Sequence, residues 1–179
     1  MSKTVLFISG SPRANSRTRA VTNVVYRLLR DQRGHAQLID LHLHELPLFN
    51  GDSAQNELAS VQQWRQLAAE AGGFFIVTPE YHNGISGALK NALDFLNAEH
   101  FLNKPVAIAA ASGGGKNGIN ALNNLRLVLR GVSANVLAGQ FAADPSQIDE
   151  NGIFTDENGV KSLQSLVQDL IAAVSLQVE

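Results

Sequence analysis

The 179-residue chain contains no cysteine, which excludes disulfides, thiolate zinc sites, iron–sulfur clusters and a cysteine nucleophile. No apolar run approaches the roughly 18 residues that cross a membrane, and the apolar stretch at residues 5–8 is too short for a signal-peptide core. A formal net charge of −2 gives no electrostatic case for binding nucleic acid or a membrane surface. Together these absences favour a soluble cytoplasmic protein.

Short apolar runs alternate along the chain with segments of helical period, which predicts an α/β fold. The length is typical of one domain, so we expect a single domain over residues 1–179. The runs predict five strands, at residues 5–8, 36–41, 74–77, 106–111 and 134–137, the first of them buried on both faces. The helical segments lie near residues 21–29, 57–71, 89–96, 119–130 and 163–174. This succession favours a doubly wound parallel sheet of strand order 2-1-3-4-5 with helices on both faces.

Ligands of such folds bind at the carboxyl ends of the strands, where the strand order reverses. The loops after the first, third and fourth strands should meet there. The first loop, residues 9–18, combines the hydroxyls of Ser11, Ser16 and Thr18 with the charges of Arg13 and Arg17. A helix begins beside them, and this mixture suits one phosphate group. The loop alone is equally typical of a polar turn with capping serines, and it lacks the glycine spacing of a dinucleotide fingerprint.

The loop after the third strand contains Pro79, Glu80, Tyr81 and His82. A rigid proline and a tyrosine suit a flat ring lying against the backbone, although a lone histidine here is more often an ordinary surface residue. Residues 84–88, Gly-Ile-Ser-Gly-Ala, nearly match the G-x-S-x-G motif of hydrolases, but alanine replaces the last glycine. We therefore interpret Ser86 as a helix cap.

The loop after the fourth strand is glycine-rich: Ser112 is followed by Gly113, Gly114 and Gly115. Glycines let the backbone approach a ligand closely, and a flexible surface turn is the alternative. The loop differs from a phosphate-binding P-loop because the first glycine and the Ser/Thr of that motif are absent.

Three further features are interpreted structurally. Asp-Glu-Asn-Gly at residues 149–152 recurs at 156–159, where Asn-Gly turns flanking a short strand are favoured over a calcium loop. His42 and His44 could face the same way like a metal pair, but no third ligand is near in sequence, so a solvated loop is favoured. Trp64 is expected to pack in the core. No metal site is predicted.

Two motifs carry a resemblance to a known family. Residues 10–16 read Gly-Ser-Pro-Arg-Ala-Asn-Ser, and Pro-Glu-Tyr-His at 79–82 runs into Ser-Gly-Ala-Leu-Lys-Asn-Ala-Leu-Asp-Phe at 86–95. The chain resembles, over nearly its whole length, the NAD(P)H-dependent FMN reductases of the flavodoxin-like proteins. It is most similar to the branch with quinone, azo-dye and chromate reductases, although Pro12 and His82 replace residues common there.

The resemblance implies FMN as bound cofactor and NADPH or NADH as hydride donor to a small-molecule acceptor by a ping-pong mechanism. It implies that the FMN phosphate is bound by Ser11, Arg13, Ser16, Arg17 and Thr18. It implies that the isoalloxazine ring lies on Pro79, Glu80, Tyr81 and His82, and that the third loop closes around the ring with Ser112, Gly113, Gly114 and Gly115. It further implies a homodimer or homotetramer, and no catalytic side chain is assigned. The alternatives are a flavodoxin-type electron carrier, disfavoured by the weak charge and few aromatics, and a flavin-free binding module.

Overall fold

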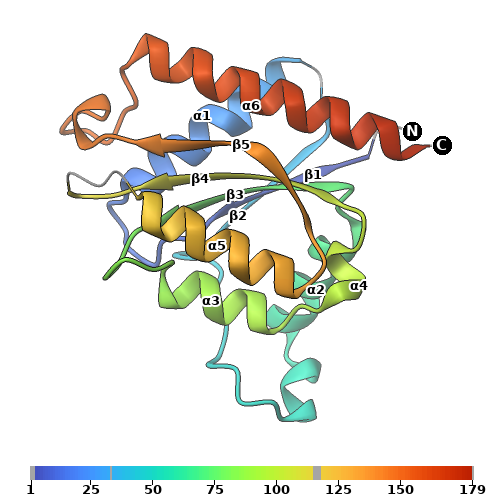
Figure 1. The fold of residues 1–179 in the computed structure, drawn as a ribbon. Coiled ribbons are helices and arrows are strands. Elements are labelled where there is room, and N and C mark those ends of the chain that lie inside the picture. The colour runs from blue at the N-terminus through green and yellow to red at the C-terminus, as the bar shows by residue number, and fades with distance from the viewer. Residues whose placement is uncertain (1–2, 33, 115–117, 179) are drawn as a thin grey trace.

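A parallel sheet of five strands organises the chain, in the order β2-β1-β3-β4-β5 (Figure 1). The computed structural model describes residues 3–32, 34–114 and 118–178. The strands are β1 (Val5–Ser9), β2 (Ala36–Asp40), β3 (Gly73–Pro79), β4 (Pro105–Ala111) and β5 (Asn135–Ala143). Every residue of β1, β3 and β4 is buried, because helices cover both faces of a parallel sheet. The predicted strand order is confirmed.

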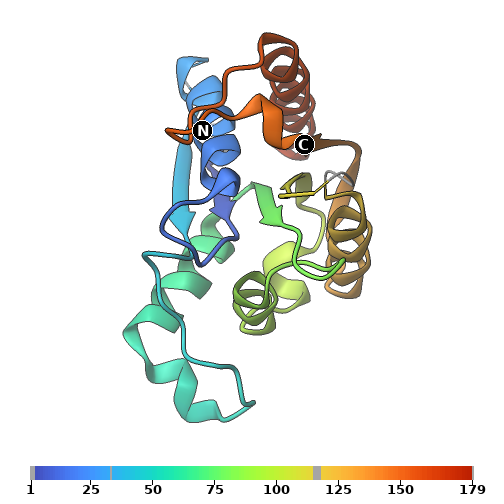
Figure 2. The same cartoon turned by 90° about the vertical axis from the view of Figure 1, so that its left-hand side faces the viewer.

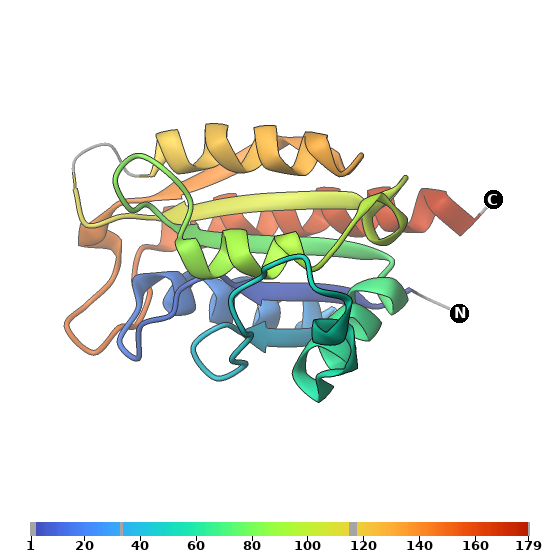
Figure 3. The same cartoon turned by 90° about the horizontal axis from the view of Figure 1, so that it is seen from below.

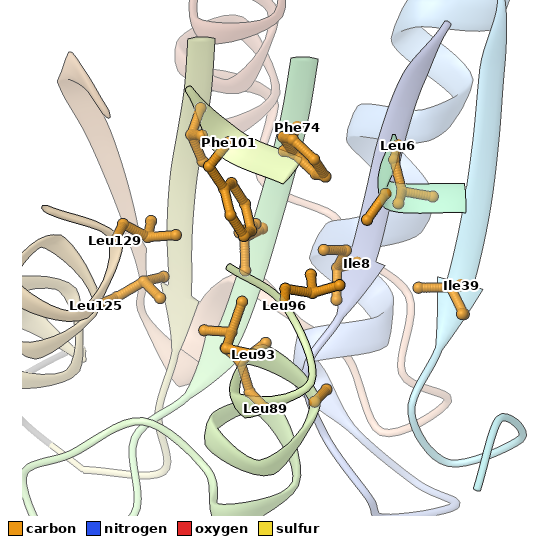
Figure 4. Packing of buried hydrophobic residues seen from close by; sticks show 14 of the residues in the cluster. Leu6, Ile8, Ile39, Phe74, Leu89, Leu93, Leu96, Phe101, Leu125 and Leu129 are labelled. Atoms are coloured by element: carbon orange, nitrogen blue, oxygen red, sulfur yellow. The ribbon is translucent and has the colours of Figure 1, made fainter. Parts of the chain in front are cut away.

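The helices form one layer on each side of the sheet, and Figure 2 shows both layers with the strands seen end-on. On one face α1 (Arg17–Asp31) and α6 (Glu157–Ser175) pack against Phe7, Phe75 and Val77. The other face carries α2 (Ala59–Glu70), α3 (Gly87–Asp94), α5 (Ile119–Gly131) and the short α4 (Ala98–Phe101). In Figure 4 leucines of these helices point toward Ile8, Phe74 and Phe101. Trp64 is fully buried there, as expected, and its indole N–H donates to the Ala92 carbonyl at 2.7 Å.

Two elements differ from the sequence-based expectation. Strand β5 continues past residue 137 to Ala143, since its second half pairs with β4 after a register shift beside Val106. Glycine and glutamine hide this half from an apolar pattern, but pairing with a buried strand needs only backbone groups. Helix α4 was not predicted; Asn97 caps it, with its side chain accepting from the Glu99 N–H at 3.1 Å.

The prediction of two Asn-Gly turns around a short strand was wrong for the second copy. Residues 149–152 do form a turn, but Asp156 caps α6, and Glu157 to Gly159 lie in its first helical turn. The strand expected between the copies is a single bridge between Ile148 and Phe154. Across the described ranges, no helix is long and apolar enough to cross a membrane.

Candidate active site

A cavity of about 600 Å³ opens at the carboxyl ends of β1, β3 and β4, where the strand order reverses. Four segments line it: Ser11 and residues 13–20 with Asn23, residues 79–81, residues 111–113 and residues 148–152. Figure 3 shows all four at the same end of the sheet. The first three contain the loops that the sequence predicted to meet. The fourth segment was missed, because nothing in its sequence distinguishes a cavity wall from an ordinary turn.

The first loop presents two arginines and a helix start to the cavity. Ser16 caps α1 by accepting from the Thr18 N–H at 3.2 Å, and the buried Ser11 hydroxyl accepts from the Arg13 N–H at 3.3 Å. Arg13 and Arg17 are exposed at the cavity wall. All five residues predicted in this loop therefore line one cavity, together with Arg19, which the sequence analysis did not single out.

The second loop forms a tight hairpin at the end of β3. Tyr81 and Gly84 exchange two backbone hydrogen bonds of 3.0 Å, and His82 and Asn83 between them have φ angles of 51° and 65°. Asparagine adopts this left-handed conformation more readily than most residues. His82 is exposed and does not line the cavity, whereas Pro79, Glu80 and Tyr81 do.

Glu80 and Tyr81 differ in how their polar atoms are used. The Glu80 carboxylate accepts from the Ala121 N–H at 3.0 Å in the first turn of α5, whose N-cap residue Gly118 has no side chain. A carboxylate there also interacts favourably with the helix dipole. The Tyr81 hydroxyl is buried and has no hydrogen-bond partner among the described residues. A buried hydroxyl without a partner is costly, so this atom fits a site that a ligand completes.

The third loop lies against the first. A Cβ placed on Gly113 would lie 3.7 Å from Arg17 Nη1, an ordinary van der Waals distance, so the third loop lies beside Arg17 and has room for a small side chain there. Ser112 donates to the Gly114 carbonyl at 3.1 Å, which closes the turn. Ser112 and Gly113 line the cavity and the exposed Gly114 does not. Gly115 lies outside the described residues.

Ser86 and the two histidines have structural partners. The buried Ser86 hydroxyl accepts from the Leu89 N–H at 3.0 Å and donates to the Gly10 carbonyl, so it caps α3 as expected. His42 Nδ1 lies 2.9 Å from the Pro12 carbonyl, and His44 Nε2 lies 3.0 Å from the Ser60 carbonyl. Within the described ranges no three His, Asp or Glu residues are grouped to hold a metal.

The groups with shifted pKa values lie at the opposite end of the sheet. Burial lowers the pKa of His100, with a further contribution from Arg65, and burial lowers the pKa of Lys104. Lys104 directly precedes β4 and donates to the Ala68 and Ala69 carbonyls at the end of α2. These shifts therefore stem from packing remote from the cavity.

Comparison with known proteins identifies the family. The sequence model of the NADPH-dependent FMN reductases matches residues 3–147. The chain belongs to this family. Its fold, its enzymatic nature and its use of FMN and NAD(P)H agree with what the sequence resemblance implied. A flavodoxin-type carrier, the main alternative, is not supported.

Relatives of this FMN reductase family member include azoreductases. It is 40% identical over 175 residues, 98% of this chain and 94% of the other, to the NADPH azoreductase of Bacillus sp. strain OY1-2. It is 31% identical over 150 residues, 82% and 79% of the two chains, to the FMN-dependent NADPH-azoreductase of Staphylococcus aureus strain USA300. The flavoenzyme NAD(P)H:(acceptor) oxidoreductase FerB of Paracoccus denitrificans shares its fold, with a TM-score of 0.81 at 24% identity over 97% and 98% of the chains.

Proposed function

We propose that this FMN reductase family member is an NADPH-dependent azoreductase whose cofactor lies in the cavity at the carboxyl ends of β1, β3 and β4. The observation that carries the proposal is one cavity lined by the exposed Arg13 and Arg17 and by Tyr81, whose buried hydroxyl has no hydrogen-bond partner among the described residues. Similarity to two NADPH azoreductases favours azo compounds as acceptors and NADPH as donor. Quinones, chromate and free flavin are further acceptors to test.

The chain's own residues would bind and orient FMN rather than take part in bond making. Arg13 and Arg17, with the N–H groups at the start of α1, would neutralise and bind the phosphate. Pro79 and Tyr81 would support the flavin ring from the end of β3, and Ser112 and Gly113 would lie against the ring from the end of β4. FMN, when bound, supplies the hydride chemistry. Glu80 would act indirectly, by fixing the amino end of α5 beside the ring loop.

A ping-pong order follows if NADPH and acceptor use the same opening of the cavity in turn. We therefore expect parallel double-reciprocal plots when NADPH is varied at several fixed concentrations of acceptor. A homodimer or homotetramer and a cytoplasmic location stay predictions.

The activity is tested with purified protein saturated with FMN. NADPH oxidation and dye bleaching are followed with an azo dye, a quinone, chromate or free FMN as acceptor, and each assay is repeated with NADH. We expect NADPH-driven bleaching of the azo dye in excess of the rate with NADH. Turnover with free FMN alone, without dye reduction, would contradict the azoreductase assignment and leave a flavin reductase.

The phosphate placement is tested separately by Arg13→Ala. A hydrogen bond to a charged group contributes about 1.5–3 kcal/mol, so FMN binding should weaken by that amount. Riboflavin lacks the phosphate and should bind nearly as before. Flavin fluorescence quenching measures both dissociation constants, and equal losses for the two flavins would contradict the placement.

A further inference from the structure

The backbone carbonyls of the loop after β1 are bound by side chains that do not come from the loop itself. Arg19, in the first turn of α1, donates through Nη1 to the Ala14 carbonyl and through Nη2 to the Arg13 carbonyl at 3.5 Å. His42 Nδ1 lies 2.9 Å from the Pro12 carbonyl, and it donates because a carbonyl oxygen can only accept. Three consecutive carbonyls of the loop are thus bound by two side chains.

Asp40 joins these two donors. Its Oδ2 accepts from Arg19 Nε, and its Oδ1 accepts from the backbone N–H of His42 at 3.0 Å. Asp40 ends β2 and is in register with Ser9, the last residue of β1, so it lies directly beside the start of the loop. Its side chain is only 10% exposed, and bonds between charged groups are stronger there than at an open surface.

The direction of the carbonyls fixes the direction of the neighbouring N–H groups. The described peptide bonds are trans, and in a planar trans peptide the C=O and the following N–H point in opposite directions. The N–H groups of Arg13, Ala14 and Asn15 therefore point away from Arg19 and His42. The Arg13 N–H is bound by Ser11, and Ala14 and Asn15 line the cavity. Successive backbone N–H groups that face one side form an anion-binding surface.

We propose that Asp40 is a positioning residue for the cofactor phosphate. It holds Arg19 and His42 against the carbonyls of residues 12–14, and this turns the N–H groups of Ala14 and Asn15 toward the phosphate. Arg19 uses its Nε, Nη1 and Nη2 atoms to bind Asp40 and the loop carbonyls, so its role in this proposal is to orient the loop, while Arg13 and Arg17 are the arginines that bind the phosphate. The inference rests on the proposed placement of the phosphate.

The test is Asp40→Asn, with FMN and riboflavin affinities of the apoprotein measured by fluorescence quenching. Asparagine keeps the shape and an acceptor for the His42 N–H, but it removes the charge that holds Arg19. We expect FMN affinity to fall about tenfold, the lower end of the effect seen when a metal ligand loses the partner that orients it. Riboflavin affinity should change less than about twofold, because only the phosphate meets the reoriented N–H groups.

Two further variants control the result. Arg19→Lys keeps the charge but loses the fork that reaches both Asp40 and the loop, so it should reproduce the FMN-selective loss. It also serves as the second test if Asp40→Asn does not fold. Arg27→Ala removes an exposed arginine from the same helix and should leave both affinities unchanged.

An unchanged ratio of FMN to riboflavin affinity in Asp40→Asn and Arg19→Lys would overturn the inference, whether or not the apoprotein melts at a lower temperature. Arg13→Ala separates this failure from failure of the phosphate placement. If Arg13→Ala is FMN-selective and Asp40→Asn is not, only the role of Asp40 is wrong. If Arg13→Ala weakens both flavins equally, the phosphate lies elsewhere.

Discussion

The tetrapeptide Asp-Glu-Asn-Gly occurs at residues 149–152 and again at 156–159, and its two copies have different structures. In the first copy Asp149 Oδ1 accepts from the Asn151 and Ile153 N–H groups at 3.0 and 2.8 Å, which closes an exposed turn. In the second copy Asp156 Oδ2 accepts from the Gly159 N–H at 2.8 Å and starts α6. In both copies an aspartate binds nearby backbone N–H groups.

The residues that follow each copy explain the difference. After the first copy Phe154 turns into the core beside Phe141, and its backbone bridges back to Ile148. After the second copy the buried residues recur at helical spacing: Leu163, Leu166, Val167, Leu170 and Val174. The aspartate allows either a turn or a helix start. The apolar residues downstream decide which of the two buries more surface.

Substitutions of Gly159 and Gly152 should show the largest difference in the free energy of unfolding between the two copies. A Cβ on Gly159 would lie 2.7 Å from Phe154 Cζ and 2.8 Å from Asp156 Oδ2, so it would displace both a buried ring and the cap. Such crowding costs about 1–3 kcal/mol, and the better helix propensity of alanine offsets part of it. We expect Gly159→Ala to lower the free energy of unfolding by about 1–2 kcal/mol, measured by urea denaturation.

Gly152 provides the matched comparison. Its φ is +76°, and a Cβ there would meet nothing within 4 Å. Asparagine tolerates this conformation, so Gly152→Asn should stay within about 0.5 kcal/mol of wild type, the usual range for surface substitutions. A neutral Gly159→Ala, or a Gly152→Asn that is equally destabilising, would remove the contrast.

Alanine substitutions of Asp156 and Asp149 should show a smaller difference in the free energy of unfolding. Asp156→Ala removes an N-cap and the bond from Gln147 Nε2, at 2.5 Å, and loss of an N-cap typically costs about 1 kcal/mol. Asp149→Ala should cost about 0.5 kcal/mol, because water replaces bonds in an exposed turn. Asp156→Ser should recover part of the loss, since serine also caps helices. If serine gives no recovery in urea denaturation, capping is not what Asp156 contributes.

Substitution of the two glutamates should have the smallest effects, and the effects should be on different properties: FMN affinity for Glu150 and stability for Glu157. Glu150 lines the cavity and Glu157 does not. Under the proposed phosphate placement, Glu150→Gln removes a repulsive charge and should tighten FMN binding about two- to fivefold at low salt, with less effect at high salt. Glu157→Gln should leave FMN affinity unchanged. It should cost about 0.3–1 kcal/mol of stability by removing an acid from the first turn of α6. If FMN affinity rises equally in both variants, the change comes from the net charge of the protein and not from the position of Glu150 beside the phosphate.

Much of the fold could be predicted from local pattern. Continuous apolar runs gave β1, β3 and β4, because strands buried on both faces admit little else. The polar half of β5 and the short helix α4 escaped, since neither has a periodic apolar face. For the site, the sequence predicted only that the loops after β1, β3 and β4 meet. The wall at residues 148–152 lies beyond the family match, which ends at residue 147, and its Asp-Glu-Asn-Gly tetrapeptide indicates a turn and not a ligand site.

The sequence by itself determined the parallel sheet, its strand order and the loops that meet at its carboxyl end. These depend on hydrophobic period and on the topology rules of α/β folds. Only the tertiary structure decided which polar groups support those loops. Asp40 reaches Arg19 across 21 residues, and Glu80 reaches the start of α5 across 41. A hydrogen bond forms between groups that the completed fold brings within about 3 Å, and no local pattern in the sequence encodes that distance.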